Sequence, residues 1–221
     1  LIQDDQIVEM GPGDAGFACY CSPKGKVYGL LLVGRVDGGF LLIGSAELLP
    51  AMLDRLRMFV FRSKVEFAME DSSKVYGVTR EESATAEEAL LPVGLPVGYL
   101  VSNQADAAAS DHGFKALEIS SKIAWLNSQT TEKFIPQMLG FEDIGAVSFT
   151  EGCYPGQEIV ARARYLGKVK RQPELLTTVT EAGFSSGERV ELKRGEDWVR
   201  GTVIDGARNV DGVTHLFVIA P

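Results

Sequence analysis

The sequence predicts an α+β fold in which helices cover the faces of a mixed sheet and a small antiparallel β-barrel follows. Patterns typical of a strand, a hairpin, a helix and another strand succeed one another near the start of the chain. Beyond Gly167 the pattern changes to short alternating segments separated by glycines. We therefore divide the chain into an α+β core of residues 1–167, expected to hold two subdomains, and a β-barrel domain of residues 168–221.

The first elements are three strands. Gly16 to Cys21 predicts one strand, and Val27 to Val36 predicts a second. Asp37-Gly38-Gly39 is a turn sequence, so Phe40 to Ile43 is expected to pair with the second strand as a β-hairpin. Because the chain starts at Leu1, we expect the core to lack an opening segment at its N-terminal end.

A helix is expected over about residues 46–61, because leucines and Val60 recur there at helical spacing. Ser45 is placed to cap its first turn. The alternation through residues 65–69 predicts another strand, and residues 75–79 predict its partner. The acidic segment from Glu81 to Glu88 is expected to be a surface helix or loop.

Helical spacing returns from Phe114 to Asn127, where Trp125 is expected in the core or, as the alternative, in the wall of a cleft. Phe134 to Leu139 contains Pro136, and the pattern leaves open a kinked helix or a loop. A short helix is expected between Ile159 and Gly167. The strands expected in the barrel are Leu175–Thr180, Arg189–Lys193, Trp198–Ile204 and Thr214–Ile219.

The composition excludes several classes of protein. With 221 residues, of which 45% are hydrophobic, the chain can bury one sizeable core and a smaller module. Its net charge of −8 argues against gripping nucleic acid through the whole surface, so no direct nucleic-acid binding is expected. No apolar run approaches the ~18 residues of a membrane helix. We expect a cytoplasmic protein, or a protein of the mitochondrial matrix if the source is eukaryotic.

The three cysteines form no disulfide framework, which favours a reducing compartment. Cys19 and Cys21 are expected to pack in the core. The alternative is that they join Cys153 as metal ligands, but their spacing is unusual for a metal site and no fourth ligand is evident. No metal is therefore expected.

The most informative stretch is Glu151-Gly152-Cys153-Tyr154-Pro155-Gly156-Gln157-Glu158, which joins a thiol, two glycines and a carboxylate to a helix start. A helix N-terminus favours a thiolate, so Cys153 is the candidate reactive group, expected to be exposed at the mouth of the main cleft. Glu158 and Arg162 are spaced to pair on one helix face. If that pair is shielded, Glu158→Ala should destabilise the protein more than Cys153→Ala. The alternatives are a structural cysteine in a tight turn and an ordinary solvated pair.

This stretch resembles the signature of the YgfZ folate-binding family, relatives of the glycine cleavage T-protein, except that Glu151 stands where the family has lysine. Further segments resemble the same family, and they are Tyr20–Lys26, Arg62–Val65, Phe134–Leu139 and Val160–Arg171. The resemblance implies a T-protein-like core that holds tetrahydrofolate or a one-carbon derivative. It also implies a role in iron–sulfur cluster assembly or repair, including for enzymes that thiolate tRNA.

The resemblance implies that Cys153 is the functional thiol. It also implies that cationic side chains bind the carboxylates of the folate's glutamate tail. The expected cations are Arg62, Lys64, Arg162 and Lys170, and the other expected ligand-binding residues are Trp125, Tyr154, Gln157 and Glu158. The expected partners are folate and iron–sulfur assembly proteins or enzymes.

Two other functions remain as alternatives. A methyl- or aminomethyltransferase would need carboxylates in segments that correspond to Gly25–Gly29 and Lys122–Ala124, and neither segment contains one. A thiol redox or interaction protein without folate is the third possibility. The sequence favours an accessory protein over an enzyme.

Overall fold

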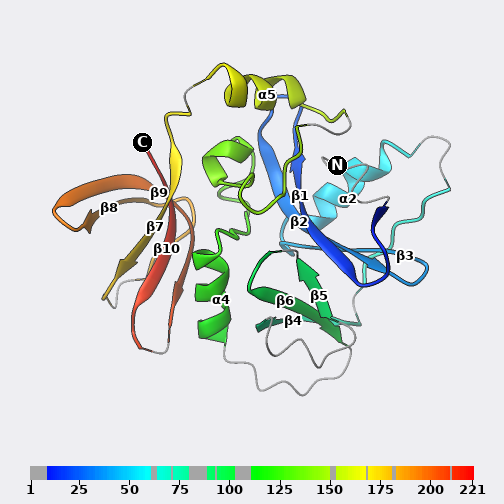
Figure 1. The fold of residues 1–221 in the computed structure, drawn as a ribbon, viewed down its shortest axis with the longest axis horizontal. Coiled ribbons are helices and arrows are strands. Elements are labelled where there is room, and N and C mark those ends of the chain that lie inside the picture. Colours follow the sequence, from blue (N-terminus) through cyan, green and yellow to red (C-terminus); the bar gives the residue numbers. More distant parts are fainter. Residues whose placement is uncertain are drawn as a thin grey trace.

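Two β-sheets flank helix α4 (Asp111–Ser120) in the computed structural model (Figure 1). The helix contacts strands of both sheets. The structure describes residues 9–60, 64–70, 72–79, 89–92, 94–102, 111–149, 153–167, 169–180, 183–209 and 211–221. This mixed arrangement confirms the α+β class.

The larger sheet has six strands in the order β3-β2-β1-β5-β6-β4. The predicted hairpin of β2 and β3 is confirmed, and Gly38 supplies the positive φ of 82° that its turn requires. The structure also pairs β1 with β2 as antiparallel strands. Strands β1 and β5 run parallel and, within the described ranges, share two residue pairs, Asp14 with Leu91 and Ala15 with Pro92. The strands are β1 Asp14–Cys21, β2 Val27–Val36, β3 Gly39–Gly44, β4 Lys74–Thr79, β5 Ala89–Pro92 and β6 Val97–Ser102.

The predicted strand over residues 65–69 is wrong. Residues 64–70 are described without strand structure, because β4 pairs with β6 instead. Val65 and Met69 stay about half exposed, at 49% and 48%. Strands β5 and β6 were not predicted, and the expectation for residues 81–88 falls outside the described residues.

The helices are shorter than predicted. Helix α2 spans Leu49–Arg57, with Leu48 at its N-cap and a proline in its first turn, so the expected Ser45 side-chain cap is wrong. Ser45 contributes its backbone carbonyl, which accepts the amides of Leu48 and Leu49. Helix α4 stops at Ser120, and Lys122 just beyond it has a left-handed φ of 60°, which ends the helical run.

Two short helices precede the second sheet. Residues Pro136–Leu139 form a 3₁₀ helix, η1, which resolves the alternatives left open for that segment, and Gly140 ends it with a φ of 67°. Helix α5 spans Gln157–Tyr165, as expected after the motif.

The second sheet is antiparallel and has four strands in the order β7-β10-β9-β8. Among the described residues no pairing closes β8 onto β7, so the barrel and the boundary at residue 168 stay predictions. The four strands are β7 Gln172–Thr178, β8 Arg189–Arg194, β9 Asp197–Arg208 and β10 Thr214–Ala220.

One hydrophobic core joins the two sheets. Phe17 and Leu32 of the first sheet belong to the same buried cluster as Ile204 and Phe217 of the second. Burying each such side chain stabilises the fold by about 1.5–3 kcal/mol, which fixes the second sheet against the first. A separate cluster around Val203 and Leu216 covers the other face of the second sheet.

Cys19 and Cys21 belong to the shared core, as predicted. Both are buried, with their Sγ atoms 3.7 Å apart. Burial raises the pKa of the Cys19 thiol well above its usual value. None of the helices in the described ranges has the length and apolar composition needed to cross a membrane.

Candidate functional site

The motif around Cys153 folds as a turn that packs against a second turn of the chain. Gly156 forms the N-cap of α5 with a φ of 81°. A Cβ placed on it would lie 2.3 Å from Ser22 O and 2.6 Å from Gly25 N, so the two backbones touch. The Gly25 amide donates to Ser22 O at 2.8 Å and closes the second turn. Two segments that carry the family resemblance are thus brought together.

Cys153 is exposed, as predicted. It stands outside α5 and is followed by Tyr154, which is buried. The Tyr154 hydroxyl has no hydrogen-bond partner in the described part of the chain, and burial raises its pKa. Tyr154 therefore acts as an anchor for the turn and leaves the neighbouring thiol accessible. No cluster of three or more potential metal ligands occurs within the described ranges.

The pair of Glu158 and Arg162 forms, but it is not shielded. Their side chains are 83% and 65% exposed, and the charged atoms lie 3.4 Å apart. An exposed pair of this kind contributes on the order of 0–1 kcal/mol. The expectation that Glu158→Ala is strongly destabilising therefore rests on burial that the structure contradicts.

The structure does not gather the expected cations into one site. Arg162 and Lys170 are exposed on α5 and on the segment after it, whereas Lys64 belongs to the segment that follows α2, and none of the described pockets is lined by all three. Arg62 lies outside the described residues. Gln157 is half-buried at the start of α5, so it belongs to the turn.

Trp125 belongs to a polar network inside the core. Its Nε1 donates to Glu118 Oε1 at 2.8 Å, and the Tyr99 hydroxyl donates to the same oxygen at 2.7 Å. The Lys115 ammonium lies 3.4 Å from Glu118 and 2.6 Å from Asp205 Oδ2, and it is the one partner of that buried oxygen among the described residues. The network ties α4 to β6 and β9, which fits the prediction of Trp125 as a core residue.

This network should make the stability of the fold decrease at alkaline pH. Burial and Glu118 raise the pKa of Tyr99. Burial opposes the charge of Lys115, but Asp205 and Glu118 outweigh it and raise the pKa of this group too. Groups with raised pKa values stabilise the folded state fully below their unfolded pKa, about 10 for tyrosine and 10.4 for lysine, and this stability is lost as the pH rises above it.

We therefore expect the free energy of unfolding to fall above about pH 10, by about 1.4 kcal/mol per pH unit for each of these groups. Urea unfolding measured between pH 7 and pH 11 tests this. Tyr99→Phe should show a shallower decline than the wild type, and superimposable slopes would contradict the assignment.

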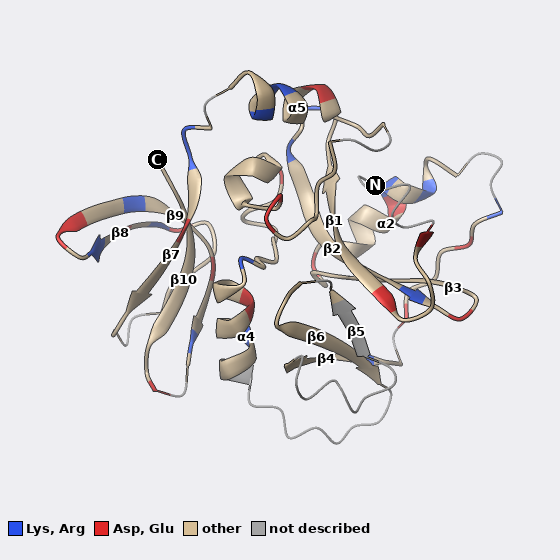
Figure 2. Ribbon diagram, in the orientation of Figure 1, with Lys and Arg blue, Asp and Glu red and all other residues tan. Residues whose placement is uncertain are grey.

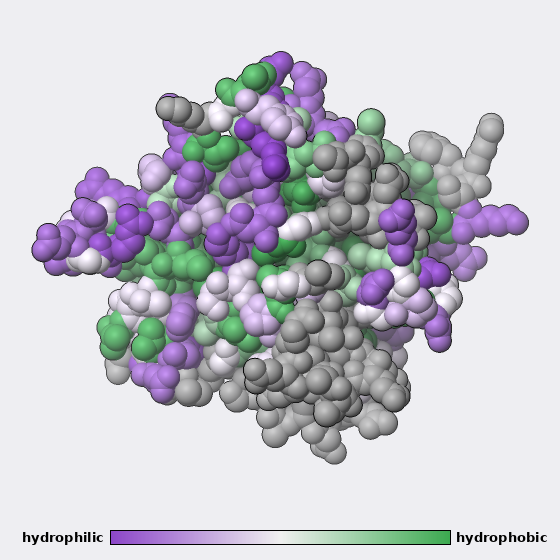
Figure 3. Space-filling model, viewed as in Figure 1, coloured by the Kyte–Doolittle hydropathy of each residue, from purple (hydrophilic) through white to green (hydrophobic). Residues whose placement is uncertain are grey.

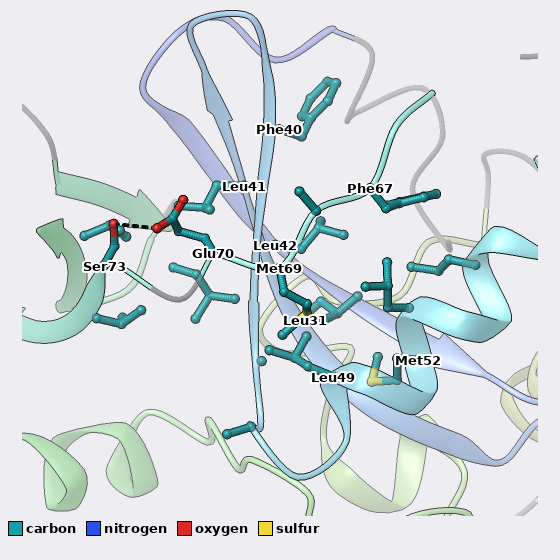
Figure 4. A pocket seen from close by; sticks show the side chains of 18 of the residues that line it. Leu31, Phe40, Leu41, Leu42, Leu49, Met52, Phe67, Met69, Glu70 and Ser73 are labelled. Atoms are coloured by element: carbon teal, nitrogen blue, oxygen red, sulfur yellow. Dashed lines mark hydrogen bonds between the residues drawn. The ribbon is translucent and has the colours of Figure 1, made fainter. Parts of the chain in front are cut away.

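Sequence reasoning missed a pocket of about 420 Å³ between β3, α2, residues 66–73 and β4, here called the apolar pocket (Figure 4). Its walls are mainly aliphatic and aromatic side chains, including Leu41, Leu49, Met52, Phe67 and Met69. The one available signal was the apolar alternation of residues 65–69, which serves this pocket instead of a strand. Cys153 does not line this pocket, so its predicted place at the mouth of a cleft stays a prediction.

Three polar residues are among those that line the apolar pocket, Glu66, Glu70 and Ser73, and Glu70 and Ser73 lie together in it (Figure 4). Glu70 Oε1 accepts the Ser72 hydroxyl, the Ser72 amide at 2.9 Å and the Ser73 hydroxyl at 3.5 Å. The Ser72 hydrogen bonds hold the pKa of Glu70 below its usual value. The carboxylate is thus kept charged and oriented at the edge of an apolar cavity.

Comparison with known proteins places these features in context. No family model matches the chain. The chain is 31% identical to the tRNA-modifying protein YgfZ of Klebsiella pneumoniae, over 91% of this chain and 72% of that protein. It is 26% identical to the protein of the same name from Aliivibrio fischeri, over 97% and 76%. An uncharacterized protein of Haemophilus influenzae is 30% identical over 96% and 78%.

Proposed function

This chain belongs to the YgfZ family, and on that basis we propose that it is a tetrahydrofolate-binding accessory protein that supports tRNA modification. The relatives from Klebsiella pneumoniae and Aliivibrio fischeri are named as tRNA-modifying proteins. In the finer form of the proposal, the ligand is tetrahydrofolate or a one-carbon derivative. The process supported is iron–sulfur cluster assembly or repair for enzymes that thiolate tRNA.

The apolar pocket is the observation that carries the folate proposal. Its volume of about 420 Å³ lies within the usual range of small-molecule sites, which combine apolar walls with few polar groups. A pterin presents an amino group and a ring N–H on one edge, and a carboxylate can accept both. Glu70, whose pKa is lowered by the hydrogen bonds of Ser72, is suited to that role.

The rest of the ligand follows from this placement. The aminobenzoyl ring packs against Phe67 and Met69, and the glutamate tail points to solvent. Lys64, close in sequence to the pocket lining, is exposed there as a partner for the tail. Arg57 is held nearby because its Nη2 donates to Phe67 O at 3.3 Å.

Binding without one-carbon transfer is the form of the proposal that the residues favour. A carboxylate with a lowered pKa is a weak general base, so Glu70 is better suited to orient a pterin than to accept a proton. In this proposal Cys153 contacts the iron–sulfur partner, because its thiol is exposed and does not line the apolar pocket.

Isothermal titration with tetrahydrofolate under anaerobic reducing conditions tests the proposal. We expect one molecule to bind per chain. Glu70→Gln should weaken binding about 10- to 100-fold, because a hydrogen bond to a charged group is worth about 1.5–3 kcal/mol. Ala46→Phe, which fills the pocket from an exposed position, should abolish binding.

Glu196→Gln is the matched control, since it removes the same charge from an exposed turn of the second sheet. It should bind like the wild type. In cells without the protein, thiolated tRNA should fall, and the wild type but not Ala46→Phe should restore it. The absence of a binding isotherm for the wild type would reject the folate proposal, whereas restoration by Ala46→Phe would separate the tRNA role from the pocket.

A further inference from the structure

The second sheet carries a groove at the end where β8 and β9 meet. Two pockets, of about 500 and 560 Å³, adjoin there because both are lined by Glu191, Arg200 and Pro221. We call the combined feature the arginine groove. Its charged and polar lining also includes Arg171, Arg189, Arg194, Thr202 and the carboxylates of Glu174 and Asp197, with Trp198 beside them.

The strand register explains why these side chains share one surface. Arg189 pairs with Thr202, and Glu191 pairs with Arg200. Because side chains alternate along a strand, Trp198, Arg200 and Thr202 point to one face and follow each other at about 6.6 Å. Val199 and Val203 point to the opposite face and pack in the hydrophobic cluster there.

Two arginines of the groove have no ion-pair partner within the described ranges. Arg200 pairs with Glu191 at 2.9 Å and Arg194 pairs with Glu174 at 2.6 Å. The side chains of Arg171 and Arg189 are exposed and make no ion pair within the described ranges. Figure 2 shows basic residues where the chain enters β7 and along β8, and Figure 3 shows that this end of the sheet is largely hydrophilic.

Trp198 is the one strongly apolar side chain displayed among these charges. It is 64% exposed, and no stacked aromatic partner for it exists in the described part of the chain. A single exposed apolar residue is ordinary on a protein surface. An indole in a groove with unpaired guanidinium groups is more specific, since bases stack on aromatic rings and arginine binds phosphate through two hydrogen bonds.

We propose that the arginine groove binds a short unpaired segment of RNA, with a base stacked on Trp198 and phosphates held by Arg171 and Arg189. The segment must be unpaired because stacking on a side chain needs a base that is free of its duplex. We infer a short segment because the net charge of −8 argues against binding a polyanion through the whole surface, so the contact is confined to the groove. This site goes beyond the proposed folate function, because it lies on the other sheet and uses none of the residues of the apolar pocket.

Fluorescence anisotropy with a labelled eight-nucleotide single-stranded RNA of mixed sequence tests the proposal, with duplex RNA and polyglutamate as comparison ligands. The wild type should bind the single strand and bind both comparison ligands at least tenfold more weakly. Trp198→Ala should weaken binding about tenfold, within the range for loss of one stacked base, and Trp198→Phe should restore most of it. Binding should also quench the emission of Trp198.

The salt dependence of binding tests the contribution of the arginines. Arg189→Gln should lower the slope of log K against log salt by about 0.7, the value for one phosphate contact of a single strand. Lys133→Gln, which removes an exposed positive charge outside the groove, should leave affinity and slope unchanged. Polyglutamate binding as tight as RNA would make the groove an acidic-peptide site and overturn the proposal. Full RNA affinity in Trp198→Ala would overturn it as well.

Discussion

Gly156→Ala should be the most destabilising of the single substitutions considered, lowering the free energy of unfolding by about 4 kcal/mol or more. The added Cβ would meet Ser22 O at 2.3 Å and Gly25 N at 2.6 Å, and both are backbone atoms that cannot rotate away. The left-handed φ of 81° adds a further cost for any residue with a Cβ. Thermal unfolding should show a loss of about 8–16 °C for a chain of this size.

Gly38→Ala is the control for the backbone conformation alone. Its φ of 82° matches that of Gly156, but a Cβ there meets nothing within 4 Å. It should cost about 1–2 kcal/mol. Equal losses in the two variants would mean that the contact between the two turns contributes nothing.

Lys115→Met should have the second largest effect, with a loss of about 3–5 kcal/mol. The change removes the ammonium between Glu118 and Asp205, and it leaves two poorly exposed carboxylates without their common partner. Because Lys115 lies on α4 and Asp205 on β9, the loss should loosen the second sheet from the helix. Urea unfolding gives the free energy, and amide hydrogen exchange in β9 and β10 locates the loosening.

Lys122→Met provides the comparison, because Lys122 pairs with Asp143 at the surface, where the two side chains are 41% and 53% exposed. It should change stability by no more than about 1 kcal/mol. If Lys122→Met costs as much as Lys115→Met, burial of the network is not the cause. Unchanged exchange in β9 would show that the network does not couple the sheets.

Much of the fold was predictable because its signals are local. The signals for β1, β2 and the turn before β3 each consist of residues that are adjacent in the sequence. The same holds for the glycines that separate the strands of the second sheet. The strand expected at 65–69 failed because alternation reports only that one side of a segment is apolar. Here residues 66–70 line a pocket instead of pairing with a strand, whereas Val65 does not line it.

The sites were less predictable because they depend on contacts between distant segments. The motif itself indicated an exposed Cys153 and a tight turn, and the structure has both. The motif did not indicate that the ion pair of Glu158 is exposed. The i,i+4 spacing predicts which side chains are adjacent on a helix, but it does not predict whether other parts of the protein bury them. The network of Glu118 and the apolar pocket each combine side chains from several elements, so no single stretch of sequence predicts them.

The seam between β1 and β5 has a mechanical consequence. Among the described residues two backbone pairs join β1 to β5, and the edge-to-face contact of Phe17 with Tyr99 adds side-chain packing between the two halves of the large sheet. The apolar pocket straddles this seam, with Leu41 on one side and Val75 and Val101 on the other. A molecule that fills the pocket touches both halves of the sheet, so its binding energy adds to the short parallel pairing of β1 with β5 in holding them together.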